Sequence, residues 1–216
     1  MFLARSAALA AAGLTAKLAL LGEVLALGTV EKGVYRVRGD ARVNGEPAKP
    51  GMDVKAGDVI TTGPNGELVF VVNRDAFLVR RNSRVEVEGT VGALIASGLR
   101  VVTGAVLSVF APSEPKRVTT PTATIGIRGT GLYVEVEPSW SYVCTCYGTV
   151  DIEAVADPAQ RETITTRHHE QPRYVYASGA AMMVKAPVFN HSDAELILLE
   201  SLVGRVPPFG AQGGTY

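Results

Sequence analysis

Apolar and polar residues alternate with a period of two in short stretches along most of the chain. The clearest stretch is residues 132–137, where Leu132, Val134 and Val136 fall on one face and a tyrosine and two glutamates on the other. This period indicates a half-buried β-strand. Similar stretches, separated by Gly, Asn, Asp or Pro, occupy residues 33–43, 67–72, 76–79, 84–88, 99–102 and 105–110. Strands that recur at intervals of roughly 8–12 residues predict an all-β sandwich, barrel or solenoid.

A helical pattern stands out near the C-terminus. Ser192 is placed as an N-cap, and Glu195 occupies the capping-box position three residues later. The following run, residues 194–203, carries a broad apolar stripe and ends at Gly204. We expect this helix to close one end of the β-structure and to protect an exposed sheet edge.

The N-terminus has features of a secretory leader. Arg5 precedes an uncharged run of small and apolar residues over 6–16, and Val24, Leu25 and Ala26 form a small-residue pattern at a plausible cleavage site. These features predict a signal peptide over residues 1–26 and a periplasmic or otherwise exported protein. The alternative is an amphipathic N-terminal helix that stays on the mature chain. Lys17 and Glu23 favour this alternative, because charges are unusual within the apolar part of a signal peptide.

Size and charge narrow the classes of function. A chain of 216 residues fits one domain with appendages. The 21 basic residues balance the 21 acidic ones, and no segment concentrates Lys or Arg, which argues against a nucleic-acid partner. Two cysteines do not make a disulfide framework.

A glycine-rich corner precedes the strand at residues 132–137. We assign Gly126, Arg128, Gly129 and Thr130 to a structural motif, because glycine permits positive φ and close backbone approach at a corner. The alternative of a phosphate-binding loop needs a helix directly behind the glycines, and a strand follows instead. For Arg128 we expect the guanidinium to cap carbonyls left free at the turn, the alternative being an anion or partner contact.

The same region carries a family resemblance. Residues 118–136 read V-x-T-P-x-A-x-x-G-I-R-G-T-x-L-x-V-x-V. Upstream, V-N-G (43–45), V-K-A-G-D-V-I-T-T-G-P-N-G (54–66) and N-S-R-V-E-V (82–87) follow in the matching order. Together they resemble the FecR-like domain, the extracytoplasmic module of ferric-citrate-type regulators. The resemblance spans roughly residues 33–155 and implies a β-solenoid-like roll of short stacked strands, with a β-sandwich as the alternative.

The resemblance also implies an organisation and a role. We expect a FecR-like β-domain over 27–155, a β extension over 156–189, and a C-terminal helix with a flexible tail over 190–216. The chain shows neither a cytoplasmic sigma-binding segment nor an 18-residue membrane span. The expected function is therefore that of a free-standing, exported, non-enzymatic domain, which contacts a protein partner of the cell envelope in sensing or signalling. A structural envelope scaffold is an alternative.

The second alternative is a periplasmic metal- or haem-binding carrier, because Cys144 and Cys146 lie two residues apart on one strand. Their parity matches that of Val150 and Ile152 if Gly148 does not bulge the strand, so both sulfurs would share the inner face. His168 shares that parity, whereas His169 would point away. Thiolates and an imidazole suit copper or zinc, so we propose Cys144, Cys146 and His168 as the ligands. His169 or His191 would be recruited as a fourth.

Two simpler roles for the cysteines stay open. Cysteine is among the most buried residue types, so both thiols are expected to pack in the core. A Cys144–Cys146 disulfide would suit an oxidising compartment, although it needs a local bend in the strand. No nucleophile turn of the G-x-S-x-G type is present, and His168 and His169 have no acidic partner placed by spacing, so catalysis is not expected.

Overall fold

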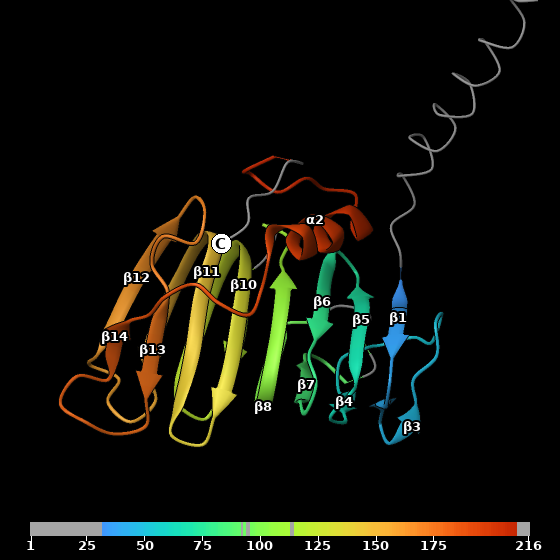
Figure 1. The fold of residues 1–216 in the computed structure, drawn as a ribbon, viewed down its shortest axis with the longest axis horizontal. Helices are drawn as coiled ribbons and strands as arrows, with labels where there is room; N and C mark the ends of the chain where they lie inside the picture. Colours follow the sequence, from blue (N-terminus) through green and yellow to red (C-terminus); the bar gives the residue numbers. More distant parts are fainter. Residues whose placement is uncertain (1–31, 92, 94–95, 113–114, 211–216) are drawn as a thin grey trace, which may run out of the picture.

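A computed structural model describes residues 32–91, 93, 96–112 and 115–210. The predicted signal peptide, residues 1–26, lies outside the described residues. The described residues form strands and one helix, which lies near the C-terminus, so the all-β prediction is confirmed (Figure 1). The elements are β1 (Gly33–Arg38), β2 (Ala41–Val43), β3 (Glu46–Pro47), β4 (Val59–Thr62), β5 (Glu67–Val72), β6 (Asp75–Val79), β7 (Arg84–Glu88), β8 (Gly98–Val109), β9 (Lys116–Thr119), β10 (Ala123–Glu137), β11 (Trp140–Ala154), β12 (Arg161–Thr166), β13 (Arg173–Tyr176), β14 (Met183–Lys185) and α2 (Asp193–Leu202).

All described strands belong to one sheet, and its pairs are antiparallel except for β8 with β9. The three long strands change partners halfway along. The first half of β8 pairs with β7 and β9, and its second half with β6 and β10. Likewise β10 pairs first with β9 and then with β8, and β11 pairs first with β13 and then with β12. The sheet therefore folds over into two layers joined by its longest strands. The first layer contains β7, β9 and β12, and the second contains β5, β6 and β13, each with the adjoining halves of the long strands.

Glycines mark the places where the long strands bend. Gly104 in β8, Gly129 in β10 and Gly148 in β11 have φ of +75°, +60° and +91°. These values lie in the left-handed region, which glycine adopts without a steric penalty. The strands expected at 99–102 and 105–110 are thus the two halves of one long strand, β8, which turns at Gly104.

The fold has two apolar cores. The inner core lies between the two layers and contains side chains from both, including Phe77, Leu99, Ile125, Val150 and Ile164. The outer core lies on the other face of the second layer, where strand side chains meet the helix; its main members are Val69, Val71, Leu78, Leu107, Val109, Tyr133, Tyr142, Cys144, Cys146, Leu196, Leu199 and Leu202. The second layer is therefore apolar on both faces and needs a cover.

Helix α2 supplies that cover. It starts after Ser192, and Ser192 and Glu195 form the predicted capping box. The helix packs over β6 and β8 (Figure 1), with Leu196 and Leu199 fully buried. The expected edge-capping role is wrong. The apolar stripe of the helix matches an apolar sheet face, which buries more hydrophobic surface than an edge of backbone groups offers.

The glycine-rich corner is structural in part. The side-chain hydroxyl of buried Thr130 donates to the Thr149 carbonyl at 3.0 Å. The expectation that Arg128 caps free carbonyls is wrong. Its guanidinium instead pairs with Asp151 on the neighbouring strand at 2.8 Å, and both side chains are exposed to solvent. The alternating strand directs its side chain outward, away from the turn. A Cβ on Gly126 would lie 3.8 Å from its nearest neighbours, so this position has room for a side chain.

We predict that Gly129→Val is far more damaging than Gly126→Ala. At Gly129 a side chain would be strained at φ +60° and its Cβ would lie 2.7 Å from Cβ of Pro112. Backbone strain of this kind costs about 1–3 kcal/mol, and the overlap adds to it. Gly126→Ala should change stability by about 0.5 kcal/mol or less. Urea denaturation of both variants measures the difference, and equal midpoints would contradict it.

Candidate metal centre

Cys144 and Cys146 lie side by side on β11, and both are fully buried. The burial agrees with the sequence, but the face does not. Val143, Val150 and Ile152 belong to the inner core, whereas both cysteines belong to the outer core. The parity argument fails because the pairing of β10 with β11 shifts between Gly131 and Leu132 and the strand turns at Gly148. The thiols therefore face the C-terminal part of the chain.

The chain after β12 brings His169 to the cysteines. His169 has φ +60°, so the backbone reverses at this residue instead of continuing as a strand. Its N–H donates to the Cys146 carbonyl at 2.9 Å, which holds the turn against β11. The side chain is buried, contrary to the expectation that it points away, because a left-handed residue breaks the alternation on which that expectation depended.

His191 arrives from the loop that precedes α2. Its ring stacks on Tyr133, with centroids 4.6 Å apart and planes at 18°. Its Nδ1 lies 2.7 Å from the Phe189 carbonyl oxygen, and Asn190 before it has φ +59°. The local turn and the stacked ring thus fix the direction in which the other ring nitrogen, Nε2, points.

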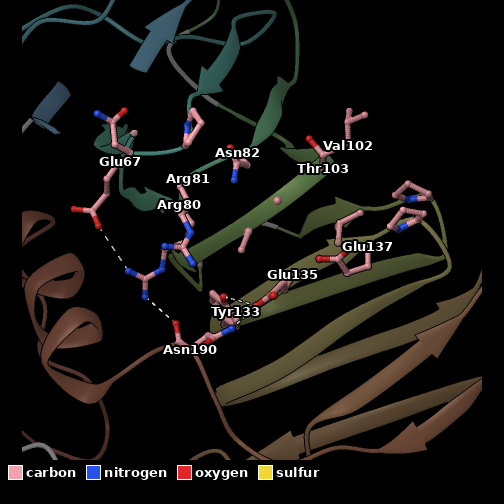
Figure 2. A pocket seen from close by; sticks show the side chains of 18 of the residues that line it. Glu67, Arg80, Arg81, Asn82, Val102, Thr103, Tyr133, Glu135, Glu137 and Asn190 are labelled. Atoms are coloured by element: carbon pink, nitrogen blue, oxygen red, sulfur yellow. Dashed lines mark hydrogen bonds and ion pairs between the residues drawn. The ribbon is translucent and has the colours of Figure 1, made fainter. Parts of the chain in front are cut away.

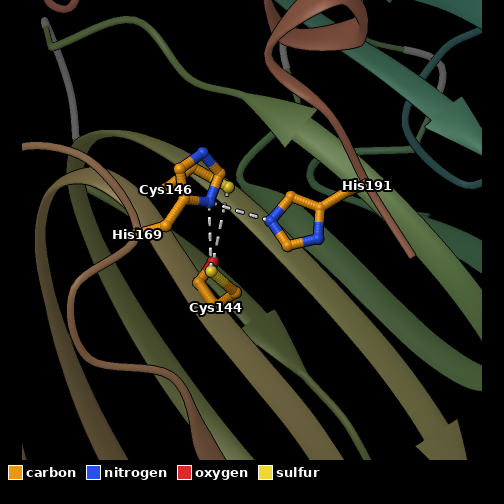
Figure 3. A group of neighbouring side chains, drawn as sticks. All are labelled: Cys144, Cys146, His169 and His191. Atoms are coloured by element: carbon orange, nitrogen blue, oxygen red, sulfur yellow. Dashed lines mark hydrogen bonds between the residues drawn. The ribbon is translucent and has the colours of Figure 1, made fainter. Parts of the chain in front are cut away.

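The donor atoms of these four residues converge (Figure 3). Sγ of Cys144, Sγ of Cys146 and one ring nitrogen each from His169 and His191 all lie within 4.8 Å of one another. His169 Nδ1 lies 3.4 Å from Cys144 Sγ and 2.9 Å from His191 Nε2. All four residues are buried. We call this group the Cys2His2 cluster.

In both histidines, one ring nitrogen faces the cluster and the other faces a protein oxygen outside it. The oxygen indicates which nitrogen of each ring carries the proton. A carbonyl oxygen only accepts, so Nδ1 of His191 carries the proton and donates a hydrogen bond to the Phe189 carbonyl. In the neutral ring, Nε2 of His191 then has the lone pair. Nε2 of His169 lies 3.3 Å from an oxygen of buried Asp193, which favours a proton there and a lone pair on Nδ1. Two lone pairs then meet at 2.9 Å. A metal ion relieves that contact, as does the other tautomer of neutral His169, in which Nδ1 donates to His191 Nε2.

The two thiols differ in acidity. Burial alone would raise the pKa of the Cys144 thiol, but hydrogen bonds from Cys146, His169 and His191 outweigh it and hold that pKa well below its ordinary range. Burial and the neighbouring Cys144 raise the pKa of Cys146. Of the two sulfurs, that of Cys144 is therefore the one predisposed to carry negative charge, the form in which cysteine binds metals.

The donor set matches a tetrahedral zinc site. With Zn–S near 2.3 Å and Zn–N near 2.0–2.1 Å, neighbouring ligand atoms of a tetrahedron lie about 3.3–3.8 Å apart. The 3.4 Å between Cys144 Sγ and His169 Nδ1 lies within this range, and the 2.9 Å between the two imidazole nitrogens is somewhat shorter. Asp193 beside His169 and the Phe189 carbonyl beside His191 complete the outer contacts that metal-binding histidines usually have.

His168, the imidazole proposed from sequence, lies elsewhere. Its side chain is about one-third exposed, and its Nε2 lies 2.9 and 3.0 Å from the two oxygens of Asp193. His168 thus contacts the carboxylate behind His169, and the cluster with the cysteines contains His169 and His191 instead. Both cysteines are free thiols rather than a disulfide, as expected for residues i and i+2 of an extended strand, whose Cα atoms lie near the upper limit for a bridge.

The sequence contained a partial signal for this cluster. The sequence offers His169 or His191 as a fourth ligand. It does not pair the two with each other, because 22 residues separate them and no spacing rule connects a turn after a hairpin with a loop before a helix. The N-cap at Ser192 placed His191 just before a helix, where side chains from a loop can reach a sheet. The helix packs over β6 and β8, and β10 alone separates β8 from β11; this placement is a property of the tertiary structure.

Comparisons with known proteins add little at the level of sequence. No protein-family model matches the chain, and no curated protein matches it. Two crystal structures of a protein described as a "putative anti-sigma factor" from Parabacteroides distasonis are similar in fold, with 13% identity and TM-scores of 0.48 and 0.47. The match covers 59% of this chain and 58% of that protein. Among the described residues, no helix is long and apolar enough to cross a membrane.

Proposed function

We propose that this chain is a non-enzymatic β-domain that binds one zinc ion in the Cys2His2 cluster. The observation that carries the proposal is the convergence of two thiols and two imidazole nitrogens within 4.8 Å, all buried. The orientation of both imidazoles toward the same point, through their contacts with Phe189 and Asp193, supports it.

Charge favours zinc over copper(I). Two thiolates and two neutral imidazoles around Zn²⁺ form a neutral group, whereas the same ligands around Cu⁺ leave one net negative charge. A buried, unpaired charge is costly, and buried Asp193 already adds a carboxylate beside the cluster. Four protein donors also leave no open position for a substrate, as in structural rather than catalytic zinc sites. The close approach of the donors leaves no room for a haem.

The domain as a whole is proposed to act through protein contacts. The resemblance to FecR-like domains over residues 33–155 supports an exported role in envelope sensing or signalling. A surface groove of about 910 Å³ lies beside the metal centre, at the bend of β8. In Figure 2 the Arg80 guanidinium lies between Glu67 and Asn190, and Arg81, Glu135 and Glu137 also line the groove. Such a charged, open groove suits a polar segment of a protein partner.

Metal content of protein purified without oxygen and dialysed against zinc tests the binding proposal. We expect one zinc per chain for the wild type and a loss of stoichiometric binding for His169→Gln. His168→Gln is the matched comparison: it should retain one zinc per chain, because His168 reaches Asp193 and not the sulfurs. Full occupancy of His169→Gln together with loss in His168→Gln would restore the ligand set expected from sequence. A wild type that binds no zinc would refute the proposal.

A further inference from the structure

The C-terminal segment, residues 186–210, is a separate cover for the sheet. It leaves β14 at the sheet edge and crosses to the outer core, where α2 packs on β6 and β8. Tyr142 donates its hydroxyl to the Pro187 carbonyl at 2.9 Å, and Glu195 pairs with Arg80 at 2.7 Å. The leucines of α2 supply the apolar contacts. Apart from the link to β14, the segment is held by noncovalent contacts alone.

The Cys2His2 cluster lies across the boundary between this segment and the sheet. Cys144 and Cys146 belong to β11, and His169 is tied to β11 through its backbone N–H. The fourth donor, His191, belongs to the C-terminal segment, as does Asp193, whose oxygens contact the histidines of the turn after β12. An ion at the cluster would therefore bond to both parts at once.

We propose that the metal centre is a latch: the ion fastens the C-terminal segment, including α2, over the outer core, and its removal frees the helix from the sheet. The inference rests on the proposed zinc site. Because His191 lies two residues before the first residue of α2, a bond from its Nε2 to an ion held by β11 restrains the start of the helix directly. Without the ion, one hydrogen-bonded contact between two imidazoles takes its place.

The coupling works in both directions. Because all four ligand residues are buried and one of them, His191, belongs to the segment itself, the ion enters or leaves when the segment opens. When the segment is lifted, Cys144, Cys146 and His169 remain together on the sheet as a three-donor site that an arriving ion meets first, and His191 then closes the shell. By linkage, whatever promotes release of the helix must weaken zinc binding by the same factor. Lifting the segment would also uncover Leu78, Leu107 and the rest of the outer core.

Hydrogen–deuterium exchange of the full chain, in zinc and in EDTA, tests the latch. We expect the backbone amides of residues 197–202 to exchange at least about tenfold more slowly in zinc, in the range of ordinary coupling between two sites. Amides of β7, whose Val85 and Val87 pack in the inner core and none of whose residues belongs to the outer core, serve as the internal reference and should change little. Zinc content is measured on the same samples.

The outcomes separate the latch from the site on which it depends. One zinc per chain with unchanged helix exchange would overturn the latch and leave the zinc site standing. Absence of bound zinc would overturn the proposed function and the latch together. His191→Ala should bind zinc more weakly through the remaining three donors and show the same fast helix exchange in zinc and in EDTA; zinc-dependent protection in that variant would also overturn the latch. The comparison of the wild type in zinc and EDTA needs no variant to fold.

Discussion

Zinc is expected to raise the thermal unfolding midpoint of the wild type by about 10 °C and to leave that of a Cys144→Ala, Cys146→Ala double variant unchanged. Binding to the native state alone stabilises it by about 4 kcal/mol when free zinc is a thousand times the dissociation constant. Each kcal/mol shifts the midpoint by roughly 2–4 °C in a chain of this size. Removal of both sulfurs leaves two imidazoles, which cannot hold the ion in a closed tetrahedral site.

A matched variant separates the loss of the ligands from the loss of buried volume. Val143 directly precedes Cys144 on β11 but faces the inner core, so Val143→Ala removes buried volume beside the site without touching a ligand. It should lower the midpoint by leaving a cavity and still respond fully to zinc. Differential scanning calorimetry in zinc and in EDTA gives both quantities. A zinc response that survives in the double cysteine variant, or is missing from the wild type, contradicts the prediction.

Lys116→Met is expected to destabilise the protein by about 3–5 kcal/mol at neutral pH, because it leaves a buried carboxylate without its counter-charge. Lys116 Nζ lies 3.3 Å from Asp75 Oδ2 and donates to the Ala96 carbonyl, and the side chains are only 4% and 2% exposed. Asp75 also accepts the Ala111 N–H at 2.8 Å. The carboxyl cannot move to water without breaking that bond.

The effect of Lys116→Met should depend on pH in a defined direction. Burial raises the pKa of Asp75 above its usual value even though Lys116 lowers it, so loss of Lys116 raises the pKa further. A folded pKa above the unfolded one stabilises the fold at low pH, and that contribution is lost as pH rises through the folded pKa. The difference from the wild type should therefore shrink from pH 7 toward pH 4.

Urea denaturation at several pH values measures this difference. The double variant Asp75→Asn, Lys116→Met is the control, because it removes the charge together with its partner and should lose less stability than Lys116→Met alone. A penalty for Lys116→Met that is the same at pH 7 and pH 4, or the same in both variants, would show that lost packing rather than an isolated carboxylate is responsible.

Local features were predictable from the sequence because they depend on neighbours along the chain. The alternation at 132–137 and the capping box of Ser192 and Glu195 gave a strand and a helix where the structure has them. The glycine-rich corner predicts the positive φ that Gly129 adopts at the bend of β10. Burial of the thiols follows from the apolar habit of cysteine in a strand of this composition.

The candidate site could be predicted only in part, because parity carries information only while a strand stays regular. The pairing shift opposite Gly131 and the bend at Gly148 turn Cys144 and Cys146 to the other face, and the left-handed conformation of His169 reverses its side chain. These changes exchange His168 for His169 as the histidine beside the sulfurs.

By itself, the sequence determined an all-β domain with corner glycines, one capped helix and a pair of buried thiols on one strand, since each depends on residues close along the chain. Only the tertiary structure decided that the second layer is apolar on both faces, that α2 covers its outer face, and that His191 thereby reaches Cys144 and Cys146. The physical reason is that burial of the outer apolar face places the helix, and the position of the helix brings together donors that are distant in sequence.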